Sequence, residues 1–65
     1  MHVISTDDGS ATVSLSGPEL SLLNNALNET LEAVADDELA ARVGASGDAV
    51  RALLGEVRDT LSALG

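Results

Sequence analysis

Residues 15–20 read Leu-Ser-Gly-Pro-Glu-Leu, and this stretch separates two parts of the chain with different apolar patterns. Ser16 and Glu19 have the spacing of a capping box, in which each side chain bonds a backbone N–H group at the start of a helix. Leu15 and Leu20 have the spacing of a hydrophobic staple, and proline is favoured in the first helical turn. These signals agree, so we expect a helix to begin directly after Ser16.

The residues before this helix have the pattern of a β-hairpin. Asp8-Gly9 favours a two-residue type I′ turn, whose central residues both have positive φ. Such a turn sets Ile4 opposite Val13 and gathers most of the apolar side chains on one face, with Val3 as the exception. An isolated two-stranded hairpin is barely stable in water. We therefore expect it to pack on the helices while leaving an open edge, which could pair with that of a second copy.

Three helices are expected after the hairpin. Acidic residues begin the second at about Asp37, where they complement the positive end of the helix, Gly44 ends it, and Ser46 caps the third. Gly55 lies inside the third helix, where glycine costs about 1 kcal/mol against alanine, so we expect another backbone to approach it closely. The buried stripes are expected to consist of Leu20, Leu23, Leu27, Leu31 and Val34 in the first helix, and of Val50, Leu54, Val57, Leu61 and Leu64 in the third.

Together these patterns predict one α+β domain covering residues 1–65, with a hairpin at about 2–15 and helices at about 17–35, 37–43 and 47–64. A chain of 65 residues buries a small fraction of its surface, and this one has no cysteine for disulfides and no aromatic residue for its core. Self-association is the remaining source of stability, so we expect a homo-oligomer, specifically a homodimer.

The chain is strongly acidic, with a formal net charge of −8 and only three basic side chains, all of them arginine. Such a field repels phosphate backbones and anionic lipid surfaces and favours a basic protein partner, although a high-salt habitat or a GC-rich genome also produces acidic surfaces. No apolar run approaches the roughly 18 residues that a membrane span needs. The N-terminus lacks the pattern of a signal peptide, so we expect a cytoplasmic protein without membrane contact.

The residue types that catalysis and metal binding require are scarce. There is no cysteine or lysine to serve as a nucleophile, and the one histidine, His2, lies beside a terminus. The carboxylates of Asp7-Asp8 and Asp36-Asp37-Glu38 fall in a turn and at a helix start, where solvated acidic residues are ordinary, rather than in a dry cleft. We therefore expect no enzyme activity, no cofactor and no metal site.

Residues 39–53, LAARVGASGDAVRAL, resemble a helix-turn-helix motif. Ala40 matches its small residue, Gly44 its turn residue, and Val50 and Leu53 its two inward-facing apolar residues. The resemblance implies a tight corner in which Ala40 lets the helices approach while Val50 and Leu53 hold the second helix inward.

The same resemblance implies an alternative function, a DNA-binding regulator that uses Arg42 and Arg51. The charge argues against it. One subunit would make about three phosphate contacts, whereas DNA-binding proteins often make about 6–10. The second helix would also present Asp48 to the groove. Nucleic acid is therefore the less favoured partner.

The outer face of the first helix carries three asparagines, which are poor helix formers. Asn24, Asn25, Asn28 and Glu29 lie within one turn or so of one another, and we expect them to form a polar contact patch, the alternative being solvated surface. The run ELSLLNNALNE, residues 19–29, resembles one found in small bacterial proteins of unassigned function. With the helix start, the later glycine and the leucine-rich last helix, the resemblance extends over much of the chain. It implies a shared fold and no particular activity.

The leading interpretation is a small acidic protein-interaction module. The absent chemistry, the small core and the negative charge favour a non-enzymatic homodimer that binds a basic partner, as an antitoxin, an immunity protein or an inhibitor does.

Overall fold

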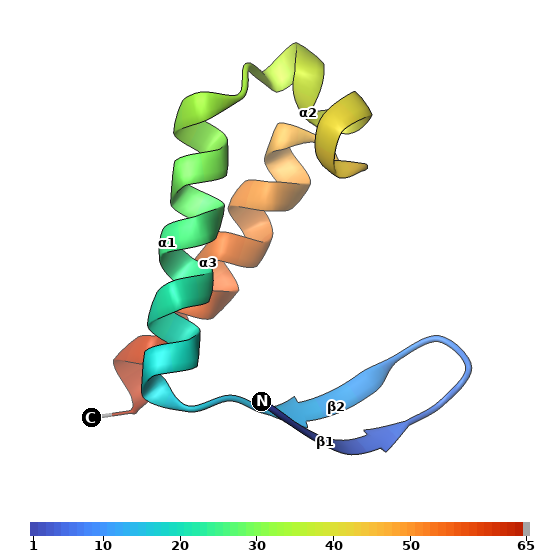
Figure 1. Cartoon of the computed structure of the whole chain (residues 1–65), viewed down its shortest axis with the longest axis vertical. Coiled ribbons are helices and arrows are strands. Elements are labelled where there is room, and N and C mark those ends of the chain that lie inside the picture. Colours follow the sequence, from blue (N-terminus) through green and yellow to red (C-terminus); the bar gives the residue numbers. More distant parts are fainter. Residues whose placement is uncertain (65) are drawn as a thin grey trace.

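The computed structural model describes residues 1–64 and has an α+β fold (Figure 1). An antiparallel hairpin comes first and three helices follow. Their bounds are β1 (His2–Thr6), β2 (Ala11–Ser14), α1 (Gly17–Ala33), α2 (Asp36–Val43) and α3 (Gly47–Ala63). The predicted hairpin and the three predicted helices are confirmed, and the helix ends agree to within two residues.

The elements form a thin, L-shaped molecule. α1 and α3 lie side by side, α2 lies at one end of this pair, and the hairpin projects from the other end beside the start of α1 (Figure 1). The principal extents of the Cα trace are 34 × 32 × 15 Å. The molecule is therefore about as wide as it is long, and it is thin in the third direction.

The signals at the helix ends operate as the sequence predicts. The Ser16 hydroxyl accepts a hydrogen bond from the Glu19 N–H at 3.2 Å, and the Glu19 carboxylate accepts one from the Ser16 N–H at 2.9 Å. Gly44 closes α2 in the left-handed conformation, with a φ of 76°. Ser46 caps α3 by accepting a hydrogen bond from the Ala49 N–H at 3.2 Å. These contacts satisfy backbone groups that a helix end leaves free.

The core lies between α1, α2 and α3 and consists of five buried apolar residues: Leu20, Leu39, Val50, Leu54 and Val57. Leu39 is completely enclosed. The rest of the predicted α1 stripe is half-buried. Leu64 was expected in the α3 stripe but is 54% exposed. It lies beside Gly17, the first residue of α1. No turn of α1 precedes Gly17, so this helix cannot cover the Leu64 side chain.

The hairpin turn differs from the prediction. Gly44 is the one residue of the 1–64 range with positive φ, so Asp8-Gly9 does not form a type I′ turn. The Asp7 carboxylate organises the turn instead, because its Oδ1 accepts hydrogen bonds from the N–H groups of Gly9 at 2.9 Å and Ser10 at 2.8 Å. An aspartate that bonds its own backbone two residues ahead stabilises a turn without positive φ.

The strand register also differs. Val3, not Ile4, lies opposite Val13, and a β-bulge at Ile4 shifts the register before Ser5 pairs with Thr12. The predicted pairing of Ile4 with Val13 is therefore wrong. An extra residue in one strand moves every later side chain to the other face. The bulge thus places Val3 on the same face as Val13 and removes the exception in the predicted alternation.

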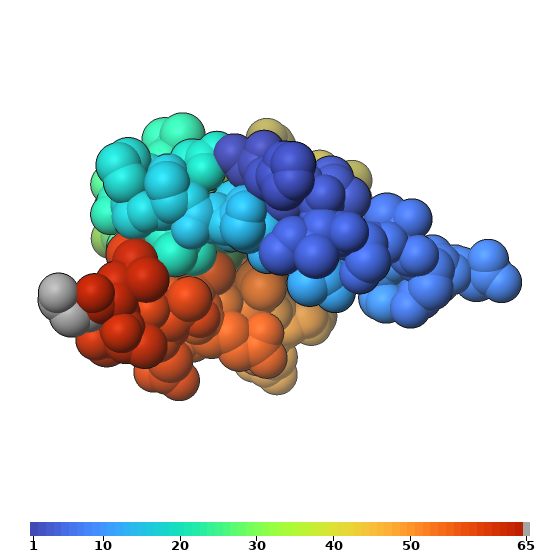
Figure 2. All heavy atoms as spheres, turned by 90° about the horizontal axis from the view of Figure 1, so that it is seen from below, coloured from blue at the N-terminus to red at the C-terminus, as the bar shows by residue number. Residues whose placement is uncertain are grey.

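The hairpin does not pack on the helices as predicted. All residues of β1 and β2 are exposed, including Val3 at 53% and Ile4 at 62%. In Figure 2 the hairpin extends beyond the helices as a separate arm. Its apolar side chains Val3 and Ile4 are left largely uncovered by residues 1–64.

The corner between α2 and α3 contains the predicted turn but not all of the predicted packing. Val50 is buried as expected, whereas Ala40 is exposed and Leu53 is 46% exposed. Leu39 and Leu54 are buried in their place, one position away in each helix. A shift of one residue turns the inward face of a helix by about 100°, so the contacts expected of Ala40 and Leu53 are wrong although the turn at Gly44 is present.

Gly55 is not approached by another backbone. A Cβ atom built there would meet nothing within 4 Å, and the residue is exposed. The close approach occurs at Gly47, where a Cβ would lie 2.9 Å from a carboxylate oxygen of Asp36.

Alanine substitutions at two glycines should therefore change stability in opposite directions. Gly55→Ala should raise the free energy of unfolding by about 0.5–1 kcal/mol, because an exposed helical alanine loses less backbone entropy. Gly44→Ala should lower it by about 1–2 kcal/mol, because a side chain is strained at positive φ. Urea denaturation at one fixed protein concentration measures both. A Gly55→Ala chain that is less stable than the wild type would contradict the open environment of Gly55.

Candidate functional site

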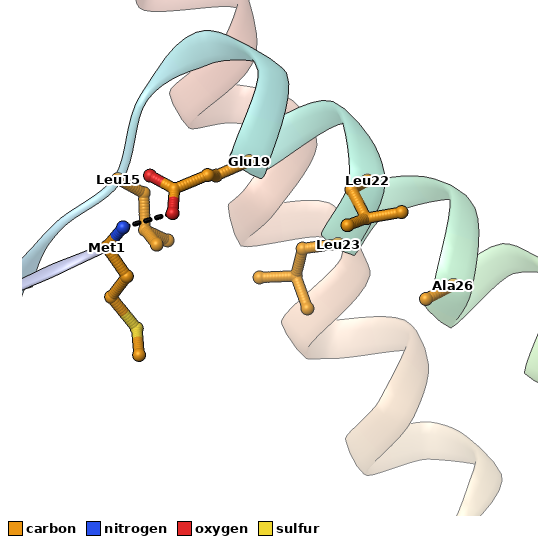
Figure 3. Close-up of a pocket in the computed structure, with 6 residues that line it drawn as sticks. All are labelled: Met1, Leu15, Glu19, Leu22, Leu23 and Ala26. Carbon is orange, nitrogen blue, oxygen red and sulfur yellow. Dashed lines mark hydrogen bonds and ion pairs between the residues drawn. The ribbon is translucent and has the colours of Figure 1, made fainter.

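An apolar groove lies where the base of the hairpin meets α1 (Figure 3). It has a volume of about 390 Å³ and opens to solvent. The lining residues are Met1 and Leu15 from the ends of the hairpin and Glu19, Leu22, Leu23 and Ala26 from α1. The α1 residues recur at spacings of three and four, so they form one side of the helix. Sequence analysis missed this groove, although the spacing of Leu22 and Ala26 could have indicated a second apolar stripe on α1.

The groove continues onto one face of the hairpin. Val3 and Val13 are directly opposite each other in the two strands. Met1 precedes Val3 by two residues and Leu15 follows Val13 by two, and residues two apart along a strand share a face. The groove residues together with Val3 and Val13 therefore form one continuous surface, called the apolar face below.

Several side chains of the apolar face are highly exposed. Met1 is 75% exposed, Leu22 is 70% exposed and Val3 is 53% exposed. Scattered exposed apolar residues are normal, but a contiguous group is typical of an interaction site.

The apolar face carries one ion pair. The Glu19 carboxylate contacts the Met1 ammonium group and also bonds the Ser16 backbone. The contact with the ammonium, followed by the bonds to Ser16, lowers the pKa of Glu19 from 4.5 to about 2. The two charges therefore cancel at neutral pH, and this surface is electrically neutral within an acidic protein.

The predicted asparagine patch divides into two environments. Asn24 and Asn28 are half-buried, whereas Asn25 and Glu29 are exposed. The Asn28 side-chain oxygen accepts a hydrogen bond from Arg58 of α3 at 3.3 Å, which links the two long helices. Asn28 thus has a structural contact, and a role of the patch in partner binding stays a prediction.

The arginines of the corner contact carboxylates of the same chain. Arg51 donates to both oxygens of Asp36 at 2.8 Å and also approaches Asp48 at 3.4 Å. Arg42 lies 3.2 Å from Glu38 one turn away. These pairs partly neutralise the two residues that the DNA-binding alternative requires.

Metal sites, buried polar residues and membrane-spanning helices are the other features considered for residues 1–64. No cluster of histidine and acidic side chains in this range could hold a metal ion. No polar or charged residue in the described part of the chain is buried. None of its helices is long and apolar enough to span a membrane.

Comparisons with known proteins do not place the chain in a family: no family model matches it, and no curated protein or solved structure matches it. The site must therefore be interpreted from its own geometry.

The Glu19 contacts should make stability depend on pH. A carboxyl group whose pKa is lower in the folded chain stabilises the fold above its ordinary pKa, and this contribution disappears as the pH falls from about 4.5 to about 2. The difference in unfolding free energy between the wild type and Glu19→Gln should therefore be largest near neutral pH and shrink over that range. Urea denaturation at several pH values measures it, with Glu56→Gln on α3 as the control. A difference that stays constant down to pH 2 would contradict the lowered pKa.

Proposed function

We propose that this chain is a small acidic, non-enzymatic protein-interaction module that acts as a homodimer and binds a basic protein partner. It would serve as an antitoxin, an immunity protein or an inhibitor does, by covering a basic surface of another protein.

The placement of the polar groups supports a non-enzymatic role. Catalytic acids and bases act in sites that exclude water, where burial and neighbouring charges adjust their pKa values. No titratable residue among those described is buried, and the groove is lined almost entirely by apolar groups. Such a surface can bind but has little means to move protons.

The distribution of charge is the observation that supports the proposal of a basic partner. The chain has eleven acidic residues and three arginines, and each arginine lies against an acceptor of the same chain. Asp37, Glu56 and Asp59 are exposed. The field that reaches an approaching molecule is therefore negative, which accelerates association with a positively charged protein.

Capture from a native lysate of the cells that produce the chain tests this proposal. The immobilised protein should retain a basic protein in stoichiometric amount at low and moderate salt and release it at high salt. Calorimetry with the purified partner should show at least about tenfold weaker binding for Asp37→Asn/Glu56→Gln/Asp59→Asn. Asn25→Ala/Glu29→Ala tests in parallel whether the asparagine patch takes part. Failure to retain a stoichiometric partner at either salt concentration would contradict the proposal.

The alternative, a DNA-binding regulator, is supported by the corner itself. The left-handed Gly44 and the capped start of α3 form a tight turn between α2 and α3, which is the turn that the helix-turn-helix resemblance implies. Against it, the corner arginines are paired with carboxylates, and phosphate contacts by unpaired cations supply most of the affinity for DNA.

A titration against genomic DNA fragments at low salt separates the two functions. We expect no saturable binding at micromolar protein. Binding that weakens steeply with salt, is lost in Arg51→Ala and persists in Arg58→Ala would favour the DNA-binding function over the module.

A further inference from the structure

We infer that the apolar face is the surface through which two copies of this chain associate, face to face about a two-fold axis. The inference rests on the proposed homodimer and specifies its interface, centred on Leu22 and including the hairpin residues Val3 and Val13. A two-fold interface uses the same patch on both copies, so one surface of the chain is sufficient.

The surface area of the chain supports a second copy as the occupant. A folded monomer of 6.6 kDa is expected to expose about 3,900 Å². The chain exposes 4622 Å², an excess of roughly 700 Å² over that expectation. A standard protein interface buries about 800 Å² on each partner. The excess of the whole molecule is thus close to the area that each copy contributes to a standard interface, and the hairpin, whose strand residues are all exposed, adds to it.

Charge indicates where on the chain that contact lies. Two copies of net charge −8 repel each other, and burying unpaired carboxylates between them would add a large desolvation cost. The apolar face avoids the second penalty, because its one carboxylate, Glu19, already pairs with the Met1 ammonium. The acidic turn residues Asp7 and Asp8 lie at the far end of the hairpin. Apolar contact can therefore hold two copies with their negative charges apart.

Pairing between hairpin edges is a poorer route to the same dimer. β1 and β2 have five and four residues, and the bulge at Ile4 interrupts the ladder of β1. Bulges and short strands are the devices that discourage edge-to-edge pairing. Edge pairing would also leave Leu22 exposed on α1.

Sedimentation equilibrium of the full chain, with two charge-matched variants, tests the interface. The wild type should be a dimer at micromolar concentration, and its dissociation constant should fall as salt rises, because salt screens the repulsion between copies. Leu22→Glu should raise the dissociation constant about a hundredfold or more, because each dimer contains two such positions. Ala52→Glu adds the same charge at an exposed position of α3 and should change it by less than about threefold.

A second measurement needs no substitution. Diluting the isotope-labelled wild type should shift the methyl resonances of Val3, Val13 and Leu22, while those of Val43, exposed at the end of α2, stay in place. This result would support the interface even if Leu22→Glu failed to fold.

The remaining outcomes overturn the inference in distinguishable ways. A wild-type monomer would overturn the interface and the proposed homodimer together. A dimer that survives Leu22→Glu, or that both glutamate variants weaken equally, would overturn the interface alone. A monomer whose Val3 and Leu22 methyl groups shift when the purified basic partner is added would assign the apolar face to that partner. Dimerisation should strengthen with salt and partner binding should weaken, so the two proposals can fail independently.

Discussion

The carboxylate of Glu19 links the two parts of this molecule, the hairpin and the helices, because it contacts both. One oxygen completes the capping box at the start of α1, and the other contacts the ammonium group at the beginning of β1. A single side chain therefore takes part in the start of the first long helix and also contacts the beginning of the hairpin. Glu19 also lines the groove, together with Met1 and Leu22.

The β-bulge at Ile4 gives the hairpin an apolar face that is available for contact. Without it, Val3 would share a face with the serines and threonines of the hairpin. With it, Val3 lies opposite Val13 and in line with Met1 and the groove. The cost is an exposed apolar surface that no element of the chain covers. A small chain without cysteine or aromatic residues gains stability most readily by covering such a surface with another molecule.

Charge and apolar surface are kept apart in this fold. Carboxylates are distributed over the hairpin turn, the second half of α1, the start of α2 and the outer side of α3, whereas the apolar face carries a neutral ion pair. This separation gives one small protein two surfaces of different chemistry. In our proposals the apolar face serves self-association, which salt should strengthen, and the acidic surface serves a basic partner, whose binding salt should weaken.

The sequence by itself determined the elements, because their signals are local. The capping box, the glycine that ends α2 and the serine that caps α3 each act within a few residues, and all are present as predicted. The main apolar stripes of the helices followed for the same reason, since helical spacing alone defines them.

Only the tertiary structure decided how those elements meet. The bulge depends on hydrogen bonding between strands, and the burial of Leu39 rather than Ala40 depends on how α2 is rotated against its neighbours. The groove combines the ends of the hairpin with the outer side of α1. The strand pattern and the helix pattern of the sequence describe these two parts separately. The candidate site therefore could not be predicted from the sequence, because its residues form one surface only when the hairpin lies beside α1.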